Sequence, residues 1–207
     1  MTSQEQMRDH WWWRPGWHVG RKMYTWHVTF DGQDQLYRLV TDYQTALESI
    51  QTIDLIPLRW LHLTMQGVGF TDEVSQGDIQ AIVSAARKRC LAISPFELSF
   101  GKPKVDPEAI MFALYPSEPA QAVRAQIRAA IADVWGVGNV PESEEWSPHV
   151  SIAYSNSEGP MAPYEEALSA LKAGPANLVV ASVELIVLNR DNRMYEWDVF
   201  EKVPLSG

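Results

Sequence analysis

The sequence predicts an α+β fold made of two similar lobes, in which mostly antiparallel sheets face each other and helices cover their outer sides. Apolar residues make up 46% of the chain and charged residues 21%, which is typical of a folded globular protein. A second observation is a repeated order of elements, because a helix, a strand with a histidine, a helix and two strands occur twice. A third is the alternation of apolar and polar side chains in the histidine-containing strands, which is typical of sheets with one buried face. The two halves share no obvious sequence identity, so the repeat is one of pattern.

The individual elements follow from hydrophobic periodicity and from the positions of proline and glycine. Helices are expected where apolar residues recur at helical spacing, at residues 34–53, 72–92, 120–135 and 163–173. Strands are expected at residues 23–30, 58–67, 95–101, 109–115, 147–154, 181–188 and 194–203. We expect strands 95–101 and 109–115 to pair with each other, and residues 67–70 to form a tight turn.

The first 21 residues differ from the rest of the chain. They contain Trp11, Trp12, Trp13 and Trp17 without a helical or strand period. We therefore expect residues 1–21 to form an arm and residues 22–207 to form a single bilobal domain. The favoured interpretation is an arm packed over a groove of the main domain, and the alternative is a lid or an aromatic surface on which a base stacks.

The charge of the chain limits the class of partner. The formal net charge is -9 and the pI is near 5.0, whereas proteins that hold long nucleic acids normally present a basic surface to the phosphates. We therefore expect a small nucleotide-like phosphodiester or an RNA end as partner, and no long nucleic acid. The single cysteine, Cys90, excludes a disulfide framework and favours a reducing compartment. With a polar N-terminus and no apolar run of about 20 residues, the sequence predicts a cytoplasmic protein without membrane contact, which we expect to be a monomer.

Two predicted strands carry the same short motif, a histidine followed two residues later by a hydroxyl side chain. His62 precedes Thr64 in one strand, and His149 precedes Ser151 in the other. Because side chains alternate between the two faces of a strand, each histidine points the same way as its hydroxyl. The residues between them are apolar, so each strand is expected to bury one face and to present an imidazole and a hydroxyl from the other.

This pair of groups, present twice, suits phosphodiester cleavage or transfer. One neutral imidazole takes a proton from the attacking water or hydroxyl, and a protonated imidazole gives one to the leaving oxygen. Histidine suits both tasks because its ordinary pKa of about 6.5 lies near the working pH. Thr64 and Ser151 would donate hydrogen bonds to the non-bridging phosphate oxygens. Such a mechanism needs no metal and no cofactor, and the sequence does not determine whether His62 or His149 is the acid.

The two motifs, 87 positions apart in equivalent places of the repeat, resemble the signature of the 2H phosphoesterase superfamily. That superfamily includes 2′-5′ RNA ligase-like proteins and cyclic nucleotide phosphodiesterases. The resemblance covers roughly residues 22 to 200 and implies a bilobal fold whose motifs face each other across a central cleft, with the roles given above for the histidines and hydroxyls. The acidic chain favours hydrolysis of a small cyclic phosphodiester of the 2′,3′-cyclic nucleotide type, and the resemblance also allows 2′-5′ RNA ligation or RNA-end processing.

A third histidine–threonine pair lies in the strand at residues 23–30. His27 and Thr29 have the same spacing as the two motifs, but no equivalent helix and hairpin follow them. Alternation nevertheless places both side chains on the less apolar face of the strand. His27 and Thr29 are therefore candidates for substrate contact, and His27 also for orienting a catalytic group, with a structural role as the alternative.

Alternation also sorts the neighbours of the motifs. Trp60 and Gln66 share the parity of His62 and are candidates for lining the cleft. Tyr154 stands three residues after Ser151 and is therefore expected on the core face.

Three other interpretations stay open at this point. His62 and His149 could be core histidines with satisfied hydrogen bonds, although two matched pairs disfavour this. His27, His62 and His149 could ligate zinc, but the usual zinc-motif spacing is missing and the matched hydroxyls would have no role. A non-catalytic nucleotide-binding module is the third, and the intact set of histidines and hydroxyls favours an enzyme over it.

Overall fold

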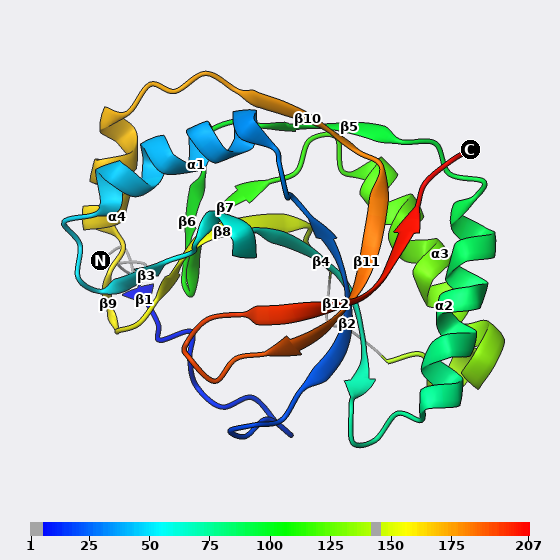
Figure 1. Ribbon diagram of the computed structural model, residues 1–207. Helices are drawn as coiled ribbons and strands as arrows, with labels where there is room; N and C mark the ends of the chain where they lie inside the picture. Colours follow the sequence, from blue (N-terminus) through cyan, green and yellow to red (C-terminus); the bar gives the residue numbers. More distant parts are fainter. Residues whose placement is uncertain (1–5, 142–145) are drawn as a thin grey trace.

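Two four-stranded sheets face each other in the middle of the molecule (Figure 1). The computed structural model describes residues 6–141 and 146–207. The first sheet has the order β12-β11-β2-β4, with bounds Glu196–Pro204, Ser182–Asn189, Met23–Thr29 and His62–Phe70. The second has the order β3-β8-β7-β6, with bounds Ile53–Leu55, His149–Ser155, Ala109–Ala113 and Lys104–Asp106. All pairs within these two sheets are antiparallel, as predicted.

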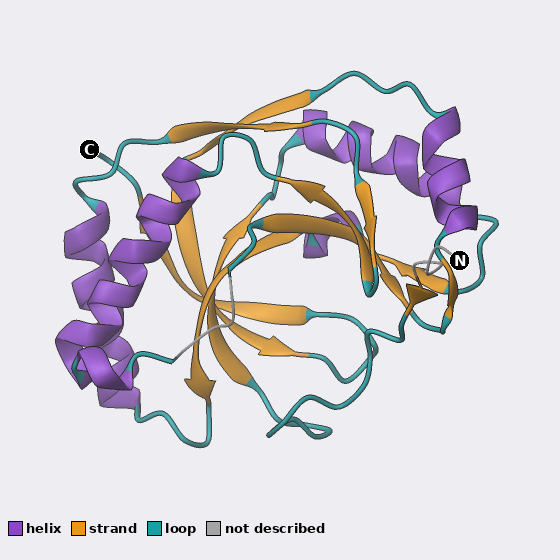
Figure 2. Ribbon diagram, turned by 180° about the vertical axis from the view of Figure 1, so that it is seen from behind, coloured by secondary structure: helices purple, strands orange, loops and turns teal. Residues whose placement is uncertain are grey.

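In the described part of the chain, four α-helices lie on the outer sides of the two sheets (Figure 2). Helices α2 (Gln76–Cys90) and α3 (Glu118–Trp135) pack together and against the first sheet. Helices α1 (Asp34–Leu47) and α4 (Ala162–Ala170) pack together on the side of the second sheet. The predicted α+β architecture is therefore confirmed, with mostly antiparallel sheets inside and helices outside. No helix in the described part of the chain is long and apolar enough to cross a membrane.

The predicted pairing of strands 95–101 and 109–115 is wrong. Strand β5 (Phe96–Phe100) pairs with β10 (Ala176–Val180), which the sequence analysis did not predict. Strand β7 instead pairs with β6 and β8, and only a single bridge between Ser99 and Tyr115 links the two predicted partners. The physical reason is the tight turn after Asp106, which lets β6 occupy the edge of β7 that the prediction gave to β5.

Both motif strands contain an irregularity directly after the motif. In β4, Thr64 lies opposite His27 while Gln66 lies opposite the next residue, Trp26, so one residue of β4 is extra. In β8, Ser151 lies opposite Met111 while Ala153 lies opposite Ile110, with the same consequence. A bulge of this kind reverses the facing of the side chains that directly follow it. Strand β4 has a second irregularity between Gly67 and Gly69, where Tyr24 and Thr25 are the partners on β2. Strand β4 also continues to Phe70, so the predicted turn at residues 67–70 is wrong.

The core lies between each sheet and its helices. Leu61, directly before β4, and Leu63 and Met65 within it are each 1% exposed, as alternation around His62 predicts. Val150 and Ile152 are fully buried next to the second motif. Burying such apolar side chains stabilises the fold by about 1.5–3 kcal/mol each. The apolar faces of the motif strands are therefore fixed in the core, and this holds the opposite faces in place.

The described part of the N-terminal arm, residues 6–21, contacts elements of both halves of the molecule. Its strand β1 (Gln6–Met7) pairs with β9 (Gly159–Pro160). The Trp11 indole N–H donates to Asp54 Oδ2 at 2.8 Å, which ties the arm to strand β3. Trp11 is buried, whereas Trp12 and Trp13 are each 49% exposed. Further along the arm, Trp12 and Gly20 bond to Arg190 and Asp191 in the loop between β11 and β12, so the arm touches both halves of the molecule.

Candidate active site

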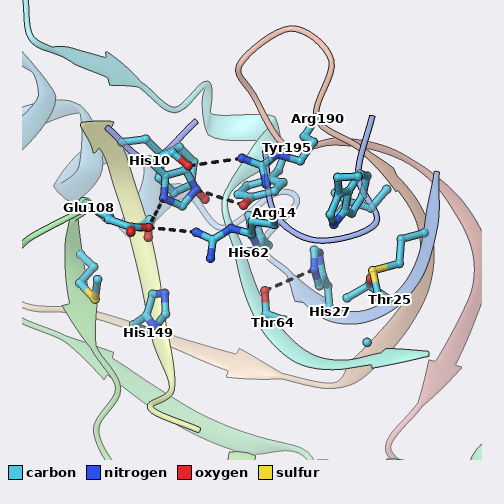
Figure 3. A pocket seen from close by; sticks show the side chains of 18 of the residues that line it. His10, Arg14, Thr25, His27, His62, Thr64, Glu108, His149, Arg190 and Tyr195 are labelled. Carbon is cyan, nitrogen blue, oxygen red and sulfur yellow. Dashed lines mark hydrogen bonds and ion pairs between the residues drawn. The ribbon is translucent and has the colours of Figure 1, made fainter. Parts of the chain in front are cut away.

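A cavity of about 390 Å³ lies between the two sheets (Figure 3). It is lined by His10, His27, His62 and His149, which are four of the five histidines of the chain. Thr64 and Ser151 line the same cavity, so the structure brings both predicted motifs together. The remaining lining comes from the two sheets, from the β11–β12 hairpin and from the arm: Arg14, Trp17, Met23, Thr25, Gly67, Asp106, Glu108, Ala109, Met111, Tyr154, Leu188, Arg190 and Tyr195.

The two motif histidines are held in the same way. His62 Nδ1 lies 2.8 Å from the carbonyl oxygen of Trp60, and His149 Nδ1 lies 2.8 Å from that of Ser147. A carbonyl oxygen only accepts hydrogen bonds, so Nδ1 carries the proton in both rings. Nε2 is thereby left as the atom that takes up or releases a proton. Each ring has a fixed tautomer and orientation, which a general acid or base requires.

Burial changes the protonation of His62. Desolvation is the largest effect and, with the nearby His149, lowers its pKa from 6.5 to about 4, although the hydrogen bond to the Trp60 carbonyl acts in the opposite direction. His62 is therefore neutral at neutral pH in the unliganded cavity. An anion between the two rings would favour their protonated forms, because an opposite charge nearby stabilises the charged state.

His27 lies directly against His62, and its ring is 1% exposed. The two imidazoles are stacked, with ring centroids 4.4 Å apart and planes at 8°. His27 Nε2 lies 3.4 Å from Thr64 Oγ1, and its Nδ1 is buried without a hydrogen-bond partner. Desolvation and the neighbouring His62 lower the pKa of His27 well below 6.5, so it is neutral. His27 therefore stacks on the candidate catalytic residue His62 and is hydrogen-bonded to the candidate phosphate-binding residue Thr64.

The bulges correct two expectations based on simple alternation. Gln66 lies outside the cavity: it is 3% exposed, and its amide donates to the carbonyl oxygens of Gly67 and Pro141. Gly67 takes its place in the cavity lining. On the other motif strand Tyr154, expected on the core face, lines the cavity and stacks on His10 at 4.2 Å. In both strands, one extra residue after the hydroxyl turns the next side chains to the opposite face of the sheet.

Two further sequence candidates also lie outside the cavity lining. Trp60 packs against Trp197 with ring centroids 4.7 Å apart, because the short helical turn at Leu58–Trp60 precedes the strand and breaks its alternation. Thr29 lies at the far end of β2 and faces a different surface hollow, which is bordered by Leu178 and Lys202. Trp60 still contributes through its carbonyl oxygen, which orients His62.

Sequence reasoning missed most of the wall that the arm contributes. His10, Arg14 and Trp17 come from the arm, and Arg190 and Tyr195 come from the β11–β12 hairpin. Only the density of tryptophans in residues 11–17 indicated a special role for this region. Which cavity the arm would meet depends on its path across both sheets, and local patterns carry no information about that path.

Glu108 links the arm to the second sheet. It accepts a hydrogen bond from Arg14 Nη2 at 2.9 Å, and its Oε2 is 3.2 Å from His10 Nδ1, although that approach lacks hydrogen-bond geometry. His10 Nε2 lies 3.1 Å from the Tyr195 hydroxyl. Burial, then Arg14 and Arg190, lower the pKa of His10 from 6.5 to about 3, so this ring is neutral as well.

The geometry of the histidines does not resemble a metal site. His27 and His62 are parallel, so their nitrogens lie side by side and do not converge on one point. Within residues 6–141 and 146–207, no group of three or more histidine, cysteine or acidic side chains is arranged to hold a metal ion. The matched Thr64 and Ser151 hydroxyls would also have no function in such a site.

Comparisons with known proteins agree with this geometry. The search among curated proteins found no match. Among solved structures, TT0787 of Thermus thermophilus is similar with a TM-score of 0.69 and 15% identity, over 89% of this chain and 98% of that one. LigT of E. coli in its apo form gives a TM-score of 0.65 and 12% identity, over 90% and 99% of the chains. LigT of E. coli complexed with 3′-AMP gives 0.67 and 12%, over the same shares. These similarities show the fold. A family model described as the 2′-5′ RNA ligase superfamily matches residues 32–192, and this chain therefore belongs to that superfamily, the 2H phosphoesterase group that its two motifs predicted.

Proposed function

We propose that this protein is a metal-independent phosphodiesterase that hydrolyses a small cyclic phosphodiester of the 2′,3′-cyclic nucleotide type. The observation that carries the proposal is the matched fixation of two imidazoles in one cavity. His62 and His149 each bond a carbonyl oxygen through Nδ1 at 2.8 Å, and each is followed by a hydroxyl in the same cavity. Core packing does not require two histidines held in the same way. A reaction in which one imidazole takes up a proton and the other releases one does require it.

In this reaction one neutral imidazole takes a proton from water while the water oxygen bonds to phosphorus. The bond between phosphorus and one ribose oxygen breaks, and the other imidazole, in its protonated form, gives its proton to that oxygen. The product is a ring-opened nucleoside monophosphate, and the two histidines have exchanged protonation states. Thr64 and Ser151 donate hydrogen bonds to the non-bridging oxygens, where negative charge builds up.

The size of the cavity supports a substrate of nucleotide dimensions. Its volume of about 390 Å³ lies in the range of small-molecule sites. Among the similar solved structures, E. coli LigT was determined with phosphate, 3′-AMP, ATP and NADP+. Small nucleotides and phosphate therefore fit the related fold, and by analogy they are reasonable ligands for this cavity.

The test is an incubation of the purified protein with each of the four nucleoside 2′,3′-cyclic monophosphates in the presence of EDTA. Chromatography identifies the products, and a His62→Ala/His149→Ala variant is the control. Turnover that persists in EDTA and is absent from the variant supports the mechanism. Activity that EDTA abolishes and zinc restores would contradict it. An RNA with a 2′,3′-cyclic phosphate end and a 5′-hydroxyl partner, tested in parallel, distinguishes hydrolysis from the 2′-5′ ligation that the family name suggests.

A further inference from the structure

The charged side chains that line the cavity are two arginines and two carboxylates. Arg14 and Arg190 are the arginines, and Asp106 and Glu108 are the carboxylates. Within the described lining the formal charges therefore cancel. A cyclic phosphodiester carries one negative charge, and the motif strands supply imidazoles and hydroxyls but no permanent positive charge. The question is which arginine is placed to meet the phosphate.

Arg190 holds the arm through its Nη2. This nitrogen donates to the carbonyl oxygens of His10 at 3.3 Å and Trp12 at 3.2 Å. Aromatic rings surround its guanidinium, among them those of Trp11 and Tyr195, with centroids 5.7 and 5.5 Å away. Only 4% of the residue is exposed, and its Nη1 is buried without a hydrogen-bond partner in the described part of the chain. Moving the guanidinium toward a ligand would break the Nη2 bonds and release the arm.

Arg14 is more exposed and has fewer partners. Its side chain is 36% exposed, its guanidinium lies 5.0 Å from the centroid of the Trp12 ring, and its Nη2 donates to Glu108 Oε2 at 2.9 Å. That bond uses one of the five N–H donors of a guanidinium, and the planar fork suits bidentate binding of phosphate oxygens. Figure 3 shows Arg14 reaching from the arm into the space between Glu108 and the His62 side of the cavity. Glu108, in the turn between β6 and β7, holds the side chain there.

We propose that Arg14 binds the phosphate of the ligand in this cavity and supplies the positive charge that the two motif strands lack. The inference rests on the proposed function in that it concerns the same cavity. Arg14 lies in the arm, outside residues 32–192 that the family model matches, so the arm adds this group to the shared catalytic frame. When phosphate enters, it competes with Glu108 for the guanidinium. Glu108 therefore opposes phosphate binding and at the same time keeps Arg14 inside the cavity.

The test measures binding of inorganic phosphate, 2′-AMP and adenosine to the full chain by titration calorimetry. Arg14→Gln should weaken binding of phosphate and 2′-AMP at least tenfold and leave adenosine within twofold, because a charge-assisted hydrogen bond to phosphate is lost. Arg14→Lys should recover part of the loss. Glu108→Gln should have the opposite effect and bind phosphate a few-fold more tightly than wild type, since the competing carboxylate is removed.

Arg193→Gln is the matched control for disturbance of the arm. Arg193 pairs with Asp9 of the arm at 3.2 Å and does not line the cavity, so phosphate binding should stay within twofold of wild type. The proposal is overturned if Arg14→Gln binds phosphate within twofold of wild type, if adenosine and 2′-AMP weaken equally, or if the wild type binds neither phosphate nor 2′-AMP.

The outcomes also separate this proposal from the catalytic one. Arg14-dependent phosphate binding without turnover of any cyclic nucleotide would leave Arg14 as a phosphate-binding residue and remove the proposed reaction. Turnover that depends on His62 and His149, with an unchanged kcat/KM in Arg14→Gln, would support the proposed reaction and remove the proposed role of Arg14.

Discussion

Buried neutral histidines should make this protein lose stability when the pH falls from 7 to 5. His10, His27 and His62 all have a pKa below 6.5 in the folded protein, chiefly because burial disfavours the charged ring. In the unfolded chain these rings take up protons around pH 6.5. Between pH 6.5 and the folded pKa the unfolded state therefore binds more protons, and the free energy of unfolding decreases as the pH falls through this window.

The size of the effect follows from the pKa values of His62 and His10, which are about 4 and about 3. Each fully neutral buried ring costs about 1.4 kcal/mol per pH unit below the unfolded pKa, or about 2 kcal/mol between pH 7 and pH 5. His62 and His10 together give a loss of about 4 kcal/mol. His27 acts in the same direction. Since small proteins are stable by about 5–15 kcal/mol, this is a large fraction of the total.

The assay is urea unfolding at pH 7 and pH 5, followed by tryptophan fluorescence. His62→Asn should lose about 2 kcal/mol less than wild type over this interval, because one titrating ring is gone. The Asp72 and Asp133 carboxyls, whose pKa values Arg21 and Arg89 hold below 3.8, titrate below the interval. A wild-type free energy of unfolding that changes by less than about 1 kcal/mol between pH 7 and pH 5 would refute the reasoning.

Three further predictions concern the cavity and the core. Thr64→Val and Ser151→Ala should each lower kcat on a cyclic nucleotide about 100-fold, because each removes one donor to the developing charge. Steady-state kinetics on both variants check this, and an unchanged kcat would exclude the hydroxyl from the reaction. Gly67→Leu should weaken 2′-AMP binding at least tenfold, because Gly67 lines the cavity and a larger side chain would fill part of it. The melting temperature should change little, since a Cβ at this position meets only the flexible end of Met23 at 3.1 Å. Equal affinity in calorimetry would mean that no ligand approaches this wall. Leu63→Ala should lower the free energy of unfolding by about 2–5 kcal/mol by leaving a cavity beneath the His62 strand, and a loss below about 1 kcal/mol in urea would show that the site collapses.

The sequence was sufficient to predict the elements whose patterns are local. Alternation around His62 and His149 placed both motif strands and their buried faces, and four helical spacings located the four helices. The helix expected at residues 34–53 ends at Leu47, however, and residue 53 already belongs to strand β3. The repeated order of elements then predicted facing antiparallel sheets. These predictions depend on each strand or helix burying one face, which neighbouring residues decide together.

Pairings between distant strands and the path of the arm were beyond local patterns. The partner of β5 is β10, about 80 residues further on, and the short strand β6 has too few residues for a periodic signal. The bulges after Thr64 and Ser151 leave no mark in composition, yet they decide that Tyr154 lines the cavity and that Gln66 does not. A single extra residue thus changed the facing of side chains that simple alternation had assigned to the other side.

The two motif strands are equivalent in their reacting groups and different in their surroundings. Each has a histidine fixed through Nδ1, a hydroxyl two residues later and a bulge, and the position three residues after the hydroxyl faces the cavity in both. That position is Gly67 in β4 and Tyr154 in β8, where the ring stacks on His10 of the arm. Proton exchange at a phosphate needs two similar groups on opposite sides, so the repeat is kept there. Recognition of the rest of a ligand needs unequal walls, and these come from the position after the bulge and from the arm. We therefore expect the parts of the chain where the repeat fails to determine which ligand this protein binds.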